Sequence, residues 1–442
     1  MCDANAEGCG QDAAVVRNTR QGTKSGAGIG RVPWRSYRRV FEVWALFSAS
    51  YIGWLGLTDM GCHISVRGTE RALDARLKAF SHGYCGSIAL LPPLARWDSI
   101  WYYGIAMEGY TGDAPDSRLT PGFPPLYSLS MRWLGDAAGC GYFTAGIWIS
   151  RLALLIAMAL LAVYAQEREG SAGHGWRAGG ALLTFPSAFI LASVYAESLF
   201  LVSALAAFVL ARRGRHGWAA LAAFGAALTR IHGLALLPGL AVLGWEQWRA
   251  KRDDDVPSTA YDVAAPDTSL RGKIPGLWCL APALGAAAAY LALAAYFWEA
   301  IGDPLAHFTA KREGWRQGFT APWVTLDTAL EHLDRAAAHR NLGSLYTILE
   351  LPCFYLIVGT VGVLCARRWW PEATYVGCAG AMSLCSGSLA GLPRFTLVMF
   401  PVFIVLARMR RWPVVWGIYL VVGAVLQVGL LVNFVRFGAP PP

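Results

Sequence analysis

YFTAGIWISRLALLIAMALLAVYA, residues Tyr142–Ala165, is an almost unbroken apolar run. A helix needs about 20 mostly apolar residues to cross the hydrocarbon core of a bilayer, so this run is long enough to span one. The rest of the chain agrees: of 442 residues, 55% are hydrophobic and 15% charged, with a mean hydropathy of +0.39. Soluble domains carry about a quarter charged residues, and the sequence therefore predicts an all-α integral membrane protein.

Similar apolar runs on either side predict one polytopic domain, residues 40–437, with about eleven spans. The predicted spans are Val40–Leu57, Tyr142–Ala165, Ala178–Val194, Ala196–Ala211, Trp218–Thr229, His232–Trp245, Leu277–Ala300, Tyr346–Ala366, Thr374–Leu389, Phe395–Ala407 and Val414–Phe434. A polar, glycine-rich tail, residues 1–39, precedes them without the apolar region of a signal peptide, so we expect it to be disordered and cytoplasmic. A short tail, residues 438–442, follows the last span.

Lysine and arginine in short connections predict which ends of the spans face the cytoplasm. The basic clusters RVPWRSYRR, ARRGRHGW, WRAKRDDD, ARRWW and RMRRW all fall on one face if the spans alternate from a cytoplasmic N-terminus. Residues 58–141 and 302–345 are then outer loops, and 247–275 is a cytoplasmic loop. Residues 302–345 are also basic, but long loops cross largely regardless of charge. The net charge of +9 is thus explained by membrane flanks, and no nucleic acid partner is expected.

Ionisable residues embedded in apolar sequence gather at the predicted outer face, which is the periplasm of a bacterium or the endoplasmic reticulum lumen of a eukaryote. The stretch ARWDSIWYYGIAMEGY, residues 95–110, places Asp98 directly after Trp97. The other such residues are Glu197, Arg230, His232, Asp303, His307 and Arg394. Because ionisable groups at membrane depth are costly and usually paired or functional, their convergence predicts an active site on this face.

Several common chemistries are not supported by motifs in the sequence. It contains no G-x-x-x-x-G-K-[ST], no G-x-G-x-x-G after a strand and no H-E-x-x-H. The ten cysteines lack metal-ligand spacing, and pairing of Cys62 with Cys85, which share one loop, stays open. We therefore expect no required metal or cofactor, although carboxylates are compatible with a divalent cation.

Glycosyl transfer would use the residue types that remain. A carboxylate can remove the proton of an acceptor hydroxyl, and cations can stabilise a leaving phosphate. Aromatic faces offer platforms for sugar rings. An enzyme that uses a lipid-linked sugar would place all of these at the boundary of lipid and water.

The sequence RWDSIWYYGIAMEGY, followed by PGFPPLYSL, resembles the first outer loop of the PIG-V-like mannosyltransferase family. FPSAFILASVYAESLFLVSALAAFVLARRG, LTRIHGLALLPGL, GDPLAHFTAKREGW and GLPRFTLVMFPVFIVLA resemble later motifs of the family in the same order, so the resemblance runs from about Arg96 to Ala407. Thr120 stands where the family's usual aromatic precedes its Pro-x-x-Pro motif. The sequences GDPLAHF and TRIHG are more similar to the bacterial branch of this family.

This resemblance implies a GT-C-type bundle with interfacial helices on the outer face and an inverting mannosyltransferase reaction. The donor would be a polyprenyl phosphate mannose, dolichyl phosphate mannose in eukaryotes, and the acceptor a glycolipid. In a eukaryotic endoplasmic reticulum the product would carry the α-1,6-linked second mannose of a glycosylphosphatidylinositol (GPI) precursor; in a bacterial plasma membrane it would be an envelope glycan or lipid. Asp98 matches the acid of the family's first outer loop. An accessory membrane subunit is compatible with this interpretation.

Structural alternatives stay open for every member of the predicted site. Asp98 is also a favourable N-cap for a helix over SIWYYGIA, with Arg96 as its partner. Arg230 and Arg394 would bind the donor phosphate or anchor their helices at the interface. Trp97 would stack on a sugar or anchor the loop.

The remaining candidates are weighed in the same way. Glu197 and His232 would contact substrate or pack between helices. Asp303 and His307 are spaced to share one helix face, but Asp303 before Pro304 is also typical of a helix cap. Glu108 is predicted to be solvated or to be a cap partner, and a role as a second acid is the alternative. For the whole chain, a transporter or flippase and an inactive scaffold of a glycolipid-assembly complex remain the alternative functions.

Overall fold

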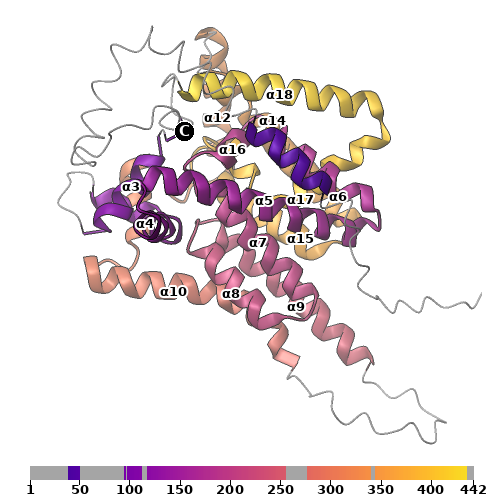
Figure 1. Cartoon of the computed structure of the whole chain (residues 1–442), viewed down its shortest axis with the longest axis horizontal. Helices are drawn as coiled ribbons and strands as arrows, with labels where there is room; N and C mark the ends of the chain where they lie inside the picture. Colours follow the sequence, from indigo (N-terminus) through magenta and orange to yellow (C-terminus); the bar gives the residue numbers. More distant parts are fainter. Residues whose placement is uncertain are drawn as a thin grey trace, which may run out of the picture.

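The computed structural model describes residues 38–49, 94–95, 97–111, 117–254, 276–339 and 344–435, and within these ranges the chain is helical without a strand. Residues 38–49 form one helix. The others are α3 (Ser99–Glu108), η2 (Ser117–Gly122), α4 (Leu126–Ala138), α5 (Tyr142–Glu169), α6 (Ala172–Leu183), η3 (Ala188–Ala192), α7 (Glu197–Arg212), α8 (His216–Ala227), α9 (Gly233–Asp254), η4 (Gly276–Leu280), α10 (Ala281–Ile301), α11 (Ala306–Trp315), α12 (Pro322–His339), α13 (Ser344–Ile348), α14 (Glu350–Ala366), α15 (Trp370–Leu384), α16 (Leu392–Thr396), α17 (Phe400–Ala407), η5 (Arg408–Arg411) and α18 (Pro413–Val435). The predicted all-α class is confirmed (Figure 1).

Four helices of the described part are long and apolar enough to cross a bilayer, and they indicate a multi-pass membrane protein. They are Tyr142–Glu169, Trp278–Ile301, Leu345–Ala366 and Pro413–Phe434, and each coincides with a predicted span. The other predicted spans correspond to helices that are shorter or, as for α9, of similar length but less apolar. For the first of them, Val40–Leu57, only the part up to residue 49 lies within the described residues.

Two predicted spans are interrupted. Phe395–Ala407 is divided between α16 and α17, and the other span breaks where its sequence cannot continue a helix. Ala178–Val194 is divided into α6 and the 3-10 helix η3. Pro186 lies in the break, and proline has no backbone N–H and clashes with the preceding turn of a helix. Hydropathy carries no information on backbone hydrogen bonds, so the apolar run Ala178–Val194 is predicted as one span.

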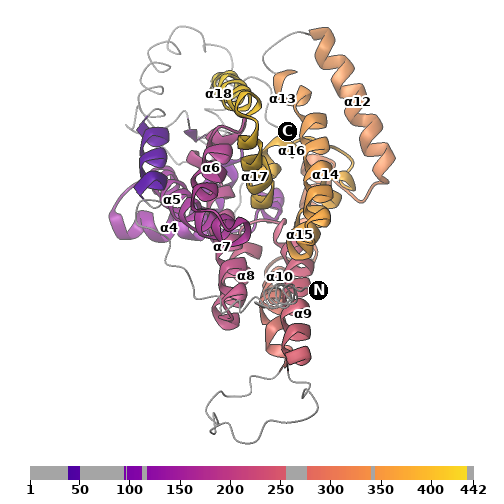
Figure 2. The same ribbon diagram turned by 90° about the vertical axis from the view of Figure 1, so that its right-hand side faces the viewer.

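The long helix α5 forms the centre of the bundle. In its most apolar stretch 61% of the residues are buried, against 22% in α18, which lies along one edge of the molecule (Figure 1). The helices α4, α6 and α7 pack against α5, and α8, α9 and α10 extend toward one end (Figure 2). Small residues permit the close approaches: a Cβ on Gly285 of α10 would lie 2.3 Å from the carbonyl oxygen of Ala220 in α8.

Segments from distant parts of the sequence meet at the N-terminal end of α7. Leu94 lies just before α3, and its carbonyl accepts a 3.1 Å hydrogen bond from the Val194 backbone between η3 and α7. The Ser187 hydroxyl donates to the Pro393 carbonyl of α16 at 2.6 Å. These bonds bring the starts of α3, α7 and α16 together in the core.

Candidate functional site

Asp98 occupies the predicted N-cap position of α3, but its carboxylate does not cap the helix. Instead its Oδ2 accepts a 2.6 Å hydrogen bond from Nη1 of Arg394, in an ion pair that joins α3 to α16. The preceding residue, Trp97, has a φ of 55°. Such a conformation is uncommon for a bulky residue and, where it occurs, is concentrated at functional sites. The predicted partner, Arg96, lies outside the described residues.

Arg394 is held by backbone bonds and aromatic faces as well as by charge. Its guanidinium carbon lies 5.5 Å from the centroid of the Tyr195 ring and 5.2 Å from that of Phe395. The Tyr195 hydroxyl in turn accepts a hydrogen bond from the backbone N–H of Asp98 at 3.3 Å. Both members of the ion pair are therefore fixed to the same tyrosine.

Glu197 connects this pair to a second arginine. It is the first residue of α7 and its side chain is fully buried. Its Oε1 lies 3.3 Å from Nε of Arg394 and also forms an ion pair with Nη1 of Arg230. Arg230 lies in the turn between α8 and α9, where its carbonyl accepts a 3.0 Å bond from the Tyr290 hydroxyl. The structure thus brings together four residues that the sequence predicted.

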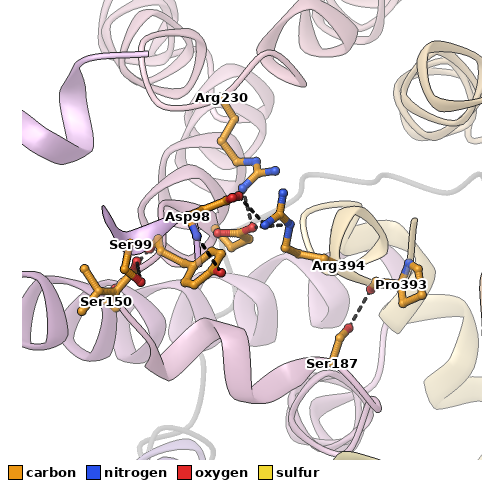
Figure 3. A network of polar contacts seen from close by, with 10 residues as sticks. Asp98, Ser99, Ser150, Ser187, Arg230, Pro393 and Arg394 are labelled. Atoms are coloured by element: carbon orange, nitrogen blue, oxygen red, sulfur yellow. Dashed lines mark hydrogen bonds and ion pairs between the residues drawn. The ribbon is translucent and has the colours of Figure 1, made fainter. Parts of the chain in front are cut away.

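Asp98, Arg394, Glu197 and Arg230 are called the charged cluster below, and Figure 3 shows Asp98, Arg394 and Arg230 converging from three directions. Its two carboxylates and two guanidinium groups balance in formal charge. Nε of Arg230 is buried and no described residue provides a hydrogen-bond acceptor for it, whereas Nε of Arg394 is buried and lies 3.3 Å from Oε1 of Glu197. Buried donors are normally satisfied, so the Nε–H group of Arg230 is available to an acceptor that enters the site.

Asp98 is the most accessible member of the charged cluster. Its side chain retains 16% of its surface, against 0% for Glu197. Oδ2 is engaged by Arg394, whereas no hydrogen bond to Oδ1 is found in the described part of the chain. The carboxylate can therefore meet a substrate hydroxyl through its second oxygen.

His232 lies against the cluster without joining it by a hydrogen bond. Its ring centroid is 4.7 Å from that of Phe395, whose face also lies 5.5 Å from the Arg230 guanidinium carbon. The Nδ1 atom is buried and no described group bonds to it. His232 therefore packs between helices, as the structural alternative predicted. Contact of its Nδ1 atom with substrate remains a prediction.

Asp303 and His307 do not act as a pair on one helix face. The helix α11 begins at Ala306, so Asp303 lies in the turn before it, where Oδ1 and Oδ2 accept 2.8 Å bonds from the Leu305 N–H and the Thr309 hydroxyl. These bonds stabilise the turn before α11, but the N-cap residue is Leu305 and α11 has no side-chain cap, so Asp303 does not cap the helix. His307 is buried on α11, and its Nδ1 lies 2.9 Å from the Pro121 carbonyl of η2.

Burial, reinforced by the nearby Lys311, lowers the pKa of His307 to about 4, while the bond to Pro121 acts in the opposite direction. The imidazole is therefore neutral at pH 7 and donates from Nδ1 to the carbonyl. Its Nε2 is then an acceptor, buried and without a partner among the described residues.

Lys311 is a residue of this region that the sequence did not single out. It lies on α11 one turn after His307, with Nζ 4.4 Å from the centroid of Phe123 and 4.3 Å from that of Trp315. Burial lowers its pKa to about 8; Asp98 opposes this shift, and Arg394 and Arg230 add to it. The only sequence signal was its place within GDPLAHFTAKREGW, where a lysine in a polar run is usually solvated.

A second buried ion cluster lies at the other end of α5 and α7. Glu372 of α15 is fully buried and accepts hydrogen bonds from the Tyr164 hydroxyl at 2.5 Å and from Nη2 of Arg168 at 3.2 Å, and it forms an ion pair with Arg168. Arg408 pairs with Glu169 nearby at 2.9 Å. These contacts fasten α15 and η5 to α5, at the end where the sequence predicted the cytoplasmic basic clusters.

Within the described residues, no three His, Cys, Asp or Glu side chains lie close enough together to hold a metal ion. The predicted pairing of Cys62 with Cys85 falls outside the described residues. Comparison of the chain with protein-family models, with curated proteins and with solved structures finds no match. The resemblance to the PIG-V-like family therefore rests on the sequence motifs alone and stays a prediction.

Proposed function

We propose that the chain is a GT-C-type membrane mannosyltransferase that takes mannose from a polyprenyl phosphate mannose and transfers it to a glycolipid on the outer face. The observation that carries the proposal is the charged cluster, in which a partly exposed carboxylate lies beside two nearly buried guanidinium groups, one of which, Arg230, has a buried N–H donor without a described acceptor. Acid–base chemistry and phosphate stabilisation need these groups side by side.

In this reaction Asp98 accepts the proton of the acceptor hydroxyl as its oxygen attacks the anomeric carbon of the donor. The bond between that carbon and the phosphate oxygen breaks, and the electron pair leaves with the lipid phosphate. Arg394 and Arg230 donate hydrogen bonds to the phosphate as its negative charge grows. Guanidinium groups suit this role because their N–H donors match phosphate oxygens.

Binding of the donor also prepares the base. In the free protein Arg394 is shared between Asp98 and Glu197. A phosphate beside Arg394 competes with Asp98 for its N–H groups, whereas Glu197 remains buried as the counter-ion of both arginines. We infer that the donor releases the Asp98 carboxylate at the moment when it is needed.

The test is transfer of labelled mannose from synthetic polyprenyl phosphate mannose to membrane glycolipids by the purified chain in liposomes. Asp98→Asn keeps the shape of the side chain but removes the base, and we expect the transfer rate to fall by about 10²- to 10⁴-fold. Glu108→Gln, at the last residue of the same helix and outside the charged cluster, is the matched control and should retain transfer. Wild-type turnover by Asp98→Asn would disprove the assigned base.

A further inference from the structure

Aromatic rings connect Lys311 of α11 to the charged cluster. The ring of Phe123 lies 5.3 Å from that of Tyr102, which lies 6.4 Å from that of Tyr195, the tyrosine that contacts both Asp98 and Arg394. The Lys311 ammonium lies over the rings of Phe123 and Trp315, which are themselves in edge contact at 5.3 Å. Its Cε would be 3.5 Å from a Cβ placed on Gly122 of η2. Cation–π contacts hold an ammonium group without neutralising it, so the charge of Lys311 is retained.

The charge of Lys311 is not balanced locally. No carboxylate forms an ion pair with its Nζ in the described part of the chain, and Asp98, the acid that acts on it, is already paired with Arg394. Lys311 gives the charged cluster one cation more than it has carboxylates. A half-buried ammonium that also feels the charge of two guanidinium groups is unfavourable unless an anion is bound there or the amine loses its proton.

We propose that the Lys311 ammonium binds the phosphate of the lipid-linked donor, as a third cation beside Arg230 and Arg394. This inference rests on the proposed function and adds a positioning residue to it. The phosphate changes from a singly charged diester in the donor to a monoester of higher charge in the product. A compact, movable ammonium suits a charge that grows during the reaction, while the arginines supply the directed hydrogen bonds.

The measurement is binding of polyprenyl phosphate, the reaction product, to the full chain in detergent. Retention of radiolabelled polyprenyl phosphate is the readout, because Trp101 and Trp315, which lie 5.6 Å apart beside Lys311, are only two of 19 tryptophans and the fluorescence of the chain is not specific to this subsite. We expect Lys311→Met to weaken binding about tenfold, and Lys311→Arg to restore most of it. Arg312→Met, an exposed neighbour on the same helix, is the matched control and should bind as the wild type does.

The dependence of polyprenyl phosphate binding on pH distinguishes the effect of the Lys311 charge from that of its side-chain shape. The ammonium form is favourable for binding and is lost as pH rises through the Lys311 pKa of about 8. Between pH 7.5 and 9.5 the phosphate monoester, with a second pKa near 6, keeps a constant charge. Wild-type affinity should therefore fall over this interval, whereas the affinity of Lys311→Arg should stay level and that of Lys311→Met should be weak throughout.

The charged or titratable neighbours of Lys311 are Asp98 on α3, Arg230 and His232 at the turn before α9, His307 on α11 and Arg394 on α16.

The outcomes distinguish this inference from the proposed function. If the wild type transfers mannose and Lys311→Met binds polyprenyl phosphate equally well, the inference is wrong and the function stands. If the wild type binds polyprenyl phosphate through Lys311 but transfers no mannose, the function is wrong and the phosphate subsite stands. A wild type that does not bind polyprenyl phosphate at all overturns the subsite directly.

Discussion

Asp98 and Glu197 contact the same arginine, yet they differ in what their loss should do. Glu197 is fully buried between Arg394 and Arg230, so Glu197→Gln leaves two buried cations without their shared counter-ion. Breaking a buried ion pair in this way costs about 3–5 kcal/mol. We therefore expect Glu197→Gln to lower the unfolding midpoint in detergent strongly.

The control for this prediction is Asp98→Asn. Asp98 is partly exposed, and Arg394 keeps its ion pair with Glu197 when the Asp98 carboxylate is removed. Its unfolding midpoint should remain close to that of the wild type while transfer is lost. Equal midpoints for Glu197→Gln and the wild type would show that Glu197 is not the structural counter-ion of the cluster.

At this scale the sequence identified most of the cluster but not its pairing. Asp98, Glu197, Arg230 and Arg394 were found because each interrupts apolar sequence at the same predicted face. Which carboxylate meets which arginine depends on the turn between α8 and α9 and on α16, and hydropathy carries no information on either. Lys311 was missed because its burial arises only when α11 docks on η2.

Among the elements, the contact between α10 and α8 offers a direct test of close packing. The hydrogen of Gly285 faces the Ala220 carbonyl, and a Cβ there would lie 2.3 Å from its oxygen. Gly285→Ala should force the helices apart and cost about 1–3 kcal/mol, despite alanine's higher helix propensity. Gly362→Ala in α14 is the control, because a Cβ at Gly362 meets nothing within 4 Å. Thermal unfolding in detergent measures both, and an unchanged midpoint for Gly285→Ala would contradict the packing.

The bounds of the helices show which of them hydropathy can predict. It located α5, α10, α14 and α18, whose apolar runs are long and continuous. It joined α6 to η3, because Phe185 and Ile190 keep the run apolar across Pro186. A break in backbone hydrogen bonding leaves no mark in hydropathy, so spans with internal breaks cannot be delimited in this way.

For the whole molecule, the two ion clusters lie toward opposite ends of α7. Glu197 is its first residue, and the guanidinium carbon of Arg212, its last residue, lies 5.9 Å from the ring centroid of Tyr164, which bonds to Glu372 of the second cluster. At 1.5 Å per residue these ends are about 22 Å apart, which approaches the thickness of a bilayer's hydrocarbon core. Charges at both ends and apolar side chains between them are what a membrane-crossing bundle requires. The sequence predicts that the end with the charged cluster faces outward.

Two exposed residues test this orientation, Glu313 on α11 and Arg410 on η5. In a background whose cysteines are replaced by serine, we expect an impermeant maleimide added to intact cells or right-side-out vesicles to label Glu313→Cys and not Arg410→Cys. Detergent permeabilisation should expose both, which controls for reactivity, and retention of a single elution peak controls for folding. Labelling of both positions before permeabilisation would place the two clusters on the same side and rule out the predicted crossing. Labelling of Arg410→Cys alone would invert the orientation and put the charged cluster in the cytoplasm, where an outer-face mannosyl transfer could not occur.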